Sequence, residues 1–249
     1  MAKELIEKQL KNTFQDKAFF SRQELFDFFR KFDTDLKETT FRWNIHNLKN
    51  KHIILAVSRD LFTLQYKSVF IPNISERDYK TFLKIQKQFT ALKCCIWSTQ
   101  IISEFMLHIP AQFVTILQVE KEAIEPVYDF LKEQKQNVFI QPEEKEIERY
   151  VFKNESAIVL ESLVTKSPLQ QVNKTTTISL EKLIIDLISN QKLFAPFQGS
   201  EMIHILNTAY NRYAIHFNTL FHYAKRRGKE SEVVELLHKT DIPKTIFYD

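Results

Sequence analysis

One stretch decides the fold of the N-terminal region: SRQELFDFFRKFDTDLKETTFRWNIHNLKNKHIILAVSRDLFTL, residues 21–64. It opens with Ser21-Arg22-Gln23-Glu24, a capping box in which a serine and a glutamate three positions later satisfy free amides at a helix start. This pattern predicts a short helix that ends at about Arg30, and a turn follows at Asp33-Thr34-Asp35. The sequence then predicts a second helix from about Glu38 to Asn50.

Two short apolar runs follow this helix and predict a β-hairpin. They are Ile53 to Val57 and Leu61 to Leu64, and the turn Ser58-Arg59-Asp60 separates them. A further helix is predicted upstream, over residues 3–14. Helix, turn, helix and hairpin in this order indicate a winged helix-turn-helix over residues 1–66. In that motif the second helix of the helix-turn-helix lies in the major groove of DNA.

The predicted helix over residues 38–50 has one apolar and one polar face. Phe41, Ile45 and Leu48 recur at helical spacing and should form a buried stripe. Arginine and lysine can neutralise phosphates or bind guanine, and asparagine can bind adenine. The candidate contacts to double-stranded DNA are the side chains of the other face and of the hairpin turn: Thr39, Thr40, Arg42, Trp43, His46, Asn47, Lys49 and Arg59. The two threonines would cap the helix or contact the DNA backbone. The alternative is a solvated helix of a helical hairpin, with the tryptophan packed on neighbouring structure.

Composition excludes several classes of protein. The chain has 249 residues, 44% of them hydrophobic and 27% charged, which suits one large or two ordinary domains with a real core. Its net charge is +4, so a nucleic-acid surface must be a local patch. Gly199 and Gly228 are the only glycines. Because phosphate-binding loops need glycine where the backbone approaches the phosphate, a Rossmann dinucleotide site and a P-loop are excluded.

Cysteine usage and hydropathy indicate a cytoplasmic protein. The only cysteines are Cys94 and Cys95, and adjacent cysteines rarely form a disulfide. On a strand they would point to opposite faces as buried, reduced thiols. The N-terminus, MAKELIEKQLKNTF, predicts an amphipathic charged helix and no signal peptide, and no stretch reaches the length of a membrane span. We therefore expect no membrane partner.

Beyond a linker at residues 67–76, residues 77–249 alternate at first between apolar strands and amphipathic helices. This alternation predicts a mixed or parallel sheet with helices packed on it. The expected strands are 93–97, 113–119, 137–140 and 157–164, and the expected helices are 77–89, 99–107, 121–134 and 143–150. From residue 179 to residue 249 only helices are expected: 179–189, 198–213, 217–227 and 230–238. The predicted fold class is therefore α+β, with a winged helix-turn-helix, an α/β domain of about four strands and a helical C-terminal part.

No catalytic site, metal site or cofactor is predicted. Lys182 and Asp186 are four residues apart, which indicates either an exposed ion pair or a contact that ties their helix to the sheet. Glu143-Glu144-Lys145 matches the E-x-K pattern of metal-dependent nucleases, but its position favours the capping of a helix start. The seven histidines are scattered without metal-ligand spacing.

The densest basic run is Lys225-Arg226-Arg227-Gly228-Lys229. Cations and a following glycine are typical of a helix C-terminus, so helix termination is the first interpretation. The second is a further phosphate-binding patch made of the four cations of this run. The aromatic residues that precede it, from Tyr210 to Tyr223, are expected in the core and not as a platform for base stacking.

Three stretches resemble AbiEi-family antitoxins of type IV toxin–antitoxin systems. They are the helix start Glu38 to Trp43, the strand–helix segment that begins with Cys95 to Thr99 and ends with Glu104 to His108, and the helix Ile178 to Leu187. The last, a serine-led helix with Lys182 and Asp186 four residues apart, is similar to the C-terminal region of that family.

The resemblance implies that the N-terminal domain binds inverted repeats in its own promoter and represses it. It also implies that the C-terminal domain counters a cognate nucleotidyltransferase-type toxin, or the target of that toxin, without an assured stable complex. The chain itself would not be an enzyme. Two other functions stay open: a nuclease-like enzyme that the N-terminal module delivers to DNA, and a protein-interaction module whose helix buries Trp43 in an interface.

Overall fold

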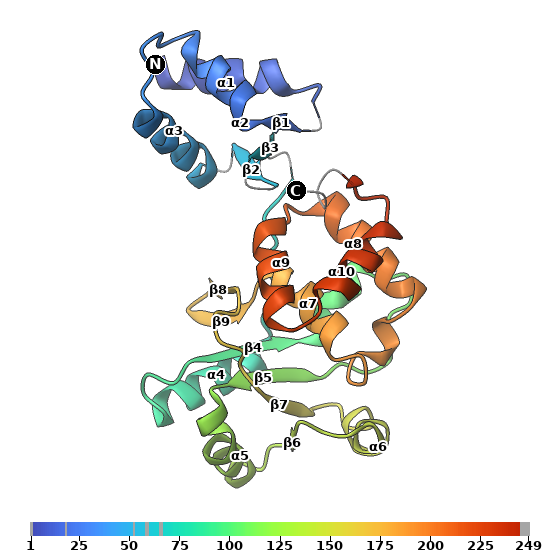
Figure 1. Cartoon of the computed structure of the whole chain (residues 1–249). Coiled ribbons are helices and arrows are strands. Elements are labelled where there is room, and N and C mark those ends of the chain that lie inside the picture. Colours follow the sequence, from blue (N-terminus) through green and yellow to red (C-terminus); the bar gives the residue numbers. More distant parts are fainter. Residues whose placement is uncertain (1, 18, 52, 58–59, 65–66, 245–249) are drawn as a thin grey trace.

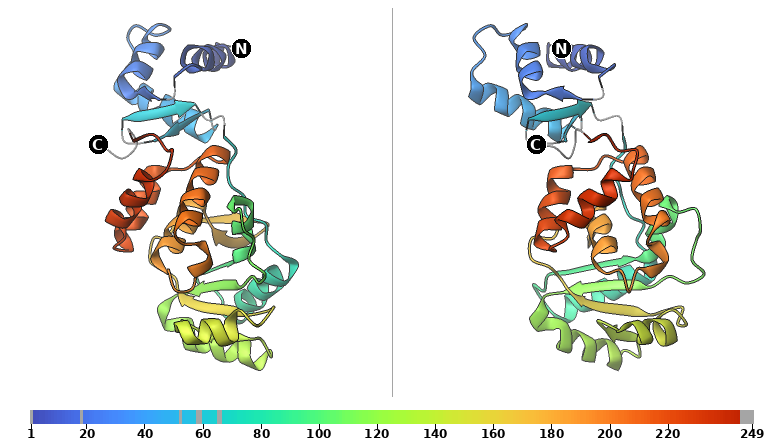
Figure 2. Two further views of the ribbon diagram at one scale, coloured as in Figure 1. Left: turned by 90° about the vertical axis from the view of Figure 1, so that its right-hand side faces the viewer. Right: turned by 45° about the vertical axis from the view of Figure 1, so that its right-hand side comes forward.

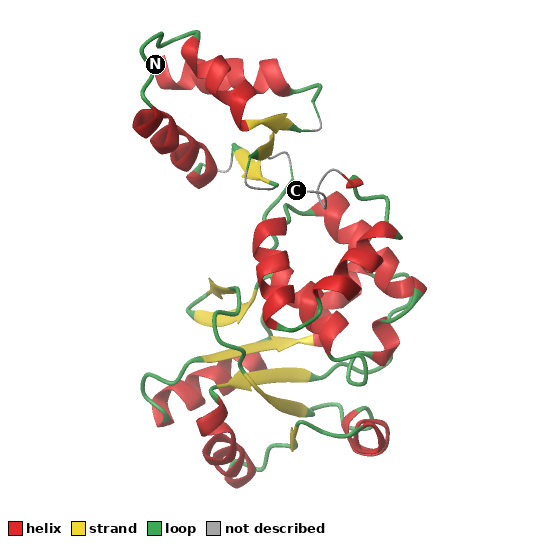
Figure 3. Ribbon diagram, viewed as in Figure 1, coloured by secondary structure: helices red, strands yellow, loops and turns green. Residues whose placement is uncertain are grey.

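The computed structural model describes residues 2–17, 19–51, 53–57, 60–64 and 67–244 (Figure 1). The N-terminal part lies at one end of the molecule, with its small sheet facing the C-terminal helices (Figure 2). Helices and strands occur along the whole chain (Figure 3), and the predicted α+β class is confirmed. None of the described helices is long and apolar enough to cross a membrane.

The N-terminal part contains three helices and a small antiparallel sheet. The helices are α1 (Ala2–Phe14), α2 (Arg22–Arg30) and α3 (Glu38–Asn50), and the strands are β1 (Phe20–Ser21), β2 (Ile54–Ala56) and β3 (Leu61–Leu64). β3 lies in the middle, so the strand order is β1-β3-β2. All three predicted helices and both hairpin strands are present, while residues 58–59 of the turn lie outside the described residues.

Local sequence explains where α2 and α3 form. The Ser21 hydroxyl accepts a hydrogen bond from the Glu24 amide at 3.1 Å, and the Glu24 carboxylate accepts one from the Ser21 amide at 2.7 Å. These two bonds are the predicted capping box, which satisfies amides that have no partner within the helix. In α3, Phe41, Ile45 and Leu48 are buried in the N-terminal core, as predicted.

The hairpin β2–β3 lies between two hydrophobic cores. Phe62 packs with the N-terminal helices, whereas Val57 is buried in the core of the C-terminal part. The predicted linker packs on the C-terminal part as well. Phe70 is only 3% exposed, and the Ser68 carbonyl accepts a hydrogen bond from the Ala214 amide at 3.0 Å. The hairpin and the linker therefore attach the N-terminal part to the rest of the chain, and the proposed domain boundaries stay a prediction.

A four-stranded sheet forms the middle of the C-terminal part. Its strands are β4 (Cys94–Ser98), β5 (Thr115–Val119), β6 (Val138–Ile140) and β7 (Ile158–Ser162), in the order β4-β5-β7-β6. β4 and β5 are antiparallel, whereas β7 is parallel to both of its neighbours. The mixed sheet is as predicted. Cys94 and Cys95 are buried, reduced and directed into two different cores, as expected for neighbours on a strand.

Helices cover both faces of this sheet. α4 (Glu76–Gln88) and α5 (Ile124–Glu133) pack on one face. The core on the other face contains α7 (Leu180–Ser189), α8 (Ser200–Arg212), α9 (Phe217–Arg226) and α10 (Glu230–His238). α7 is buried from Leu180 to Ile188, because the sheet and the other helices surround it.

Several short elements differ from the sequence prediction. Residues 99–107 do not form an α-helix but a 3-10 helix, η1 (Thr99–Phe105). Residues 144–151 form one α-helical turn, α6 (Glu144–Glu146), and a π-helical turn, η3 (Ile147–Val151). Glu143 is the N-cap residue and its amide donates to the Glu146 carboxylate at 3.1 Å, so these acids lie at a helix start, as predicted. Further short 3-10 helices are η2 (Lys121–Ala123) and η4 (Ala195–Phe197). A hairpin of β8 (Leu169–Val172) and β9 (Thr175–Ile178) is not predicted by the sequence analysis.

Candidate nucleic-acid interface

The exposed face of α3 carries seven of the eight predicted DNA-contact residues. Six of them are exposed and Asn47 is half-buried: Thr39, Thr40, Arg42, Trp43, His46, Asn47 and Lys49. At about 100° per residue these positions cover one continuous half of the helix, opposite the buried stripe. The eighth, Arg59, lies outside the described residues.

One detail predicted for this helix is wrong. Lys37 is the N-cap residue of α3, and its side chain makes no capping hydrogen bond. Because the helix begins at Glu38, Thr39 and Thr40 lie inside its first turn and do not cap it. Their hydroxyl groups are on the exposed face, where the other predicted role, contact with a nucleic-acid backbone, stays a prediction.

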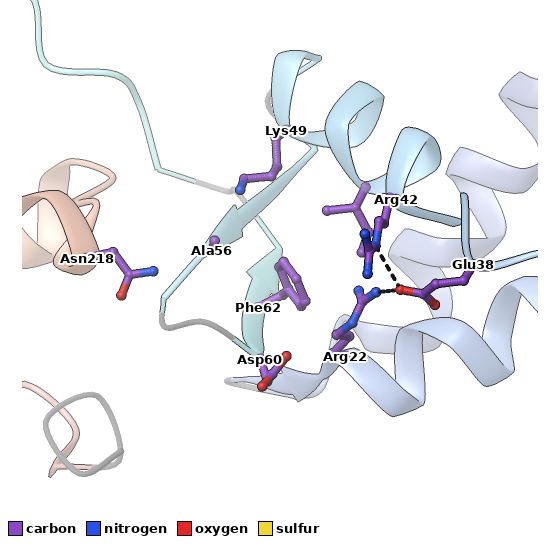
Figure 4. A pocket seen from close by; sticks show the side chains of 9 residues that line it. Arg22, Glu38, Arg42, Lys49, Ala56, Asp60, Phe62 and Asn218 are labelled. Carbon is purple, nitrogen blue, oxygen red and sulfur yellow. Dashed lines mark hydrogen bonds and ion pairs between the residues drawn. The ribbon is translucent and has the colours of Figure 1, made fainter. Parts of the chain in front are cut away.

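A cleft of about 430 Å³ follows the flank of α3 that bears Arg42 and Lys49 (Figure 4). α2 contributes Arg22, the β2–β3 hairpin contributes Asp60, and α9 contributes Asn218. The remaining lining residues are Glu38, Ile45, Ala56 and Phe62. In Figure 4 the side chain of Asn218 points from α9 toward the hairpin strand that bears Ala56. The cleft thus brings together side chains from the N-terminal and C-terminal parts.

Charges in the cleft are partly paired. The Arg22 guanidinium donates a hydrogen bond to Glu38 Oε1, and Arg42 Nε donates to the same oxygen at 3.1 Å. Desolvation raises the pKa of Glu38, but the hydrogen bond from Arg42 and the charge of Arg22 outweigh it, and the net pKa lies below the ordinary value. With Lys49 and Asp60 included, three cations face two carboxylates. The cleft therefore has an excess of positive charge.

The opposite flank of α3 borders a second hollow, of about 470 Å³. Trp43, Thr40 and Asn47 line it together with Phe32, which follows α2. Trp43 is 51% exposed and Phe32 is 43% exposed. About half of the Trp43 side chain thus faces solvent while the rest lies against this hollow, so a contact with a groove and packing on neighbouring structure both stay predictions. On the outermost side of α3, a hydrogen bond of 2.9 Å joins Asn50 to the ring of His46.

Lys182 and Asp186 are buried, so the predicted exposed ion pair is wrong. Lys182 Nζ lies 2.5 Å from Asp186 Oδ2 and donates to the Tyr223 hydroxyl at 3.0 Å. The Tyr223 hydroxyl donates to Asp186 Oδ1 at 2.8 Å, and Gln118 of β5 donates to Oδ2 at 3.2 Å. Burial lowers the pKa of Lys182, but the charge of Asp186, the groups of Tyr223 and Cys95 and the hydrogen bond to Asp186 together outweigh it, so the net pKa lies above the ordinary value and the lysine stays charged. The pair ties α7 to the sheet and to α9, which was the other interpretation.

The basic run at the end of α9 terminates the helix, as first interpreted. Gly228 has φ +65° and donates to the Lys225 carbonyl, while the Lys229 amide donates to the Ala224 carbonyl at 2.9 Å. These two bonds satisfy carbonyls at the helix end in the Schellman arrangement. Arg226 also donates to the backbone carbonyl and the hydroxyl of Thr165. A phosphate-binding role for the four cations Lys225, Arg226, Arg227 and Lys229 stays a prediction.

Sequence reasoning missed residues that folding brings to these sites. Arg22 follows the capping serine, so its position indicates a helix start and not a binding residue. Asn218 carries no local signal, because only tertiary packing brings α9 to the cleft. Tyr223 was expected in the core, and its hydroxyl completes the buried ion network. Among the described residues, no group of three His, Cys, Asp or Glu side chains could hold a metal ion.

Comparisons with known proteins place the chain in one family. No curated protein matches the chain. A family model described as a family of unknown function, DUF6577, matches residues 40–242. This match runs from the first turn of α3 through the hairpin, the mixed sheet and the C-terminal helices, and so includes most of the C-terminal part but leaves out α1, β1 and α2 of the N-terminal part. The chain therefore belongs to DUF6577, a family of unknown function.

Proposed function

We propose that the N-terminal part is a winged helix-turn-helix and that it binds double-stranded DNA through α3. The order of its elements supports this: α1, β1, α2, α3, β2 and β3, with β3 between the other two strands. In such a module α2 and α3 form the helix-turn-helix, α3 enters the major groove, and the hairpin is the wing.

The observation that carries the proposal is the exposed half of α3. A helix of 13 residues is about 20 Å long, and the major groove is about 12 Å wide, wide enough to admit a helix. Arg42 and Lys49 lie on the flank that would face phosphates or guanine. His46 lies near the middle of the exposed half and Asn47 on its other flank, and in the proposed complex these two side chains would reach base edges. The apolar stripe of the same helix packs inward, so α3 can present these groups without loss of the core.

The biological role that we propose is an antitoxin that represses its own promoter. The support is the resemblance of three stretches to AbiEi-family antitoxins. Inverted repeats in the promoter would take two copies of the chain, because one such module contacts one half-site. In the third stretch, Lys182 and Asp186 are buried, so we assign them to the stability of the C-terminal part. A surface that counters a nucleotidyltransferase-type toxin must then use other residues.

The double variant Arg42→Ala with Lys49→Ala tests DNA binding by α3. Each lost phosphate contact should reduce the slope of log affinity against log salt by about 0.9, so the slope should fall by about 1.8. Affinity for the duplex at low salt should fall at least about tenfold. The assay is fluorescence anisotropy of a labelled duplex at four salt concentrations.

A matched control removes the same charge elsewhere. Lys84→Ala with Lys87→Ala replaces two exposed lysines of α4, which lies at the other end of the molecule (Figure 1). This variant should keep the wild-type slope and nearly the wild-type affinity. Equal effects of the two double variants would contradict the proposal, because binding would then depend on total charge and not on α3.

A further inference from the structure

The cleft beside α3 already holds an anion, the carboxylate of Glu38. One oxygen of this carboxylate accepts hydrogen bonds from both Arg22 and Arg42 (Figure 4). Guanidinium groups bind carboxylates and phosphates through the same donor geometry. A phosphate oxygen could therefore take the position of Glu38 Oε1 between the two arginines.

Arg22 is held in place by the fold. Its amide donates a hydrogen bond to the Asp60 carbonyl at 2.7 Å, which joins the start of α2 to the hairpin. Its guanidinium lies 4.8 Å from the centre of the Phe41 ring, and its side chain is only 27% exposed. Arg42, by contrast, is 73% exposed. The cleft thus combines one fixed cation at its base with one accessible cation at its rim.

Two further donors lie where an extended polyanion would reach them. Lys49 is two helical turns beyond Arg42 on the same flank of α3, and Asn218, on α9, lines the cleft beside the hairpin near Ala56 (Figure 4). A single small anion would need only the two arginines. Donors spread along the cleft fit a chain of phosphates, such as the backbone strand that borders a major groove.

We propose that this cleft is a binding site for the DNA backbone, in which a phosphodiester displaces Glu38 from Arg22 and Arg42 while Asn218 of the C-terminal part contacts the same strand. This inference rests on the proposed function, since it supposes that α3 lies in the adjacent groove. Glu38 is then an internal competitor that lowers the affinity of the free protein for DNA. Asp60 adds a second carboxylate to the lining of the cleft, and its negative charge would also lower the affinity for DNA.

The variant Glu38→Gln tests the competitor, because it keeps the size of the side chain and removes its charge. We expect duplex affinity to rise about two- to fivefold, the range that corresponds to the energies of exposed ion pairs. The matched control is Glu76→Gln in α4, where Glu76 forms an exposed ion pair with Lys80 at 2.7 Å. The control should leave affinity unchanged.

Two more variants test the other donors. Arg22→Ala should lower affinity and reduce the salt slope by about 0.9, as expected for one lost phosphate contact. Asn218→Ala should lower affinity with an unchanged salt slope, because the amide carries no charge. Thr219→Ala, the exposed neighbour of Asn218 outside the cleft, is the control. Circular dichroism and the thermal midpoint of each variant show whether it is folded.

The outcomes separate this inference from the proposed function. Affinity that falls or stays unchanged in a folded Glu38→Gln variant would overturn the competitor role, even if the Arg42/Lys49 variant behaves as proposed. If Glu38→Gln does not fold, an unchanged slope in Arg22→Ala together with unchanged affinity in Asn218→Ala would overturn the site. A wild-type chain that binds no duplex would overturn both the site and the proposed function.

Discussion

Replacing Lys182 with methionine should destabilise the protein strongly. Among the described residues, Lys182 is the only cation that forms an ion pair with the buried carboxylate of Asp186. Lys182 is 0% exposed and Asp186 is 3% exposed. The variant keeps the length of the side chain and removes its charge. Asp186 would then be left in the core between α7, α9 and the sheet, with hydrogen bonds from Tyr223 and Gln118 alone.

The expected loss of stability comes from the uncompensated charge of the Asp186 carboxylate. Removing one partner of a buried ion pair costs about 3–5 kcal/mol, since the remaining charge is not compensated. The two remaining hydrogen bonds to Asp186, at 2.8 and 3.2 Å, favour the lower end, about 3 kcal/mol. For a chain of this size, 1 kcal/mol shifts the thermal midpoint by about 2–4 °C, so the midpoint should fall by about 6–12 °C.

Calorimetry and urea unfolding of three variants and the wild type measure this effect. The double variant Lys182→Met with Asp186→Leu removes both charges and should recover much of the loss, because buried ion pairs can be replaced by apolar side chains at little cost. Lys80→Met, in the exposed pair of α4, should change stability by less than about 1 kcal/mol. A single Lys182→Met variant within 1 kcal/mol of the wild type would refute the reasoning.

Four other predictions concern local structure. Ser21→Ala should lower the free energy of unfolding by about 1 kcal/mol in chemical denaturation, since it removes the cap of α2. Because hydrogen bonds from Lys17 and the Ser21 amide lower the pKa of Glu24 from 4.5 to about 2, the stabilisation from Glu24 should be full above pH 4.5 and disappear as the pH falls toward 2. Gly228→Ala should lower the free energy of unfolding by about 1 kcal/mol, because alanine is strained at this positive φ although its Cβ would meet no other atom. Gly228→Asn should lower it less, and an equal loss for the two variants would contradict this explanation. Burial raises the pKa of Cys94 to about 11 and that of Cys95 to about 12, so an alkylating reagent at pH 8 should modify neither thiol until the protein unfolds.

Much of the local structure could be predicted because short-range patterns determine it. The capping box at Ser21, the apolar stripe of α3 and the glycine after α9 each depend on residues within one or two turns. The β8–β9 hairpin could not be predicted in this way. Its turn residues, Asn173 and Lys174, adopt φ of 47° and 66° without the glycine that usually marks such a turn.

The residues of the candidate site could also be predicted only where a local pattern indicates them. The exposed residues of α3 follow from helical periodicity, so sequence alone was enough to select them. Arg22 and Asn218 join the cleft only through tertiary packing, and no local pattern indicates it. The burial of Lys182 and Asp186 was also beyond the sequence, because a spacing of four residues is the same for an exposed and a buried pair. What distinguishes them is Tyr223 and Gln118, which lie on other elements.

The most direct test of the central proposal is the binding of the whole chain to the DNA upstream of its own gene. Fluorescence anisotropy would compare that duplex with a scrambled duplex of equal length at near-physiological salt. If α3 binds an operator in its own promoter, the upstream duplex should bind about a thousandfold more tightly, as specific sites do. Equal, weak binding to both duplexes would contradict the proposed autorepressor and would leave the N-terminal part as a module for another partner.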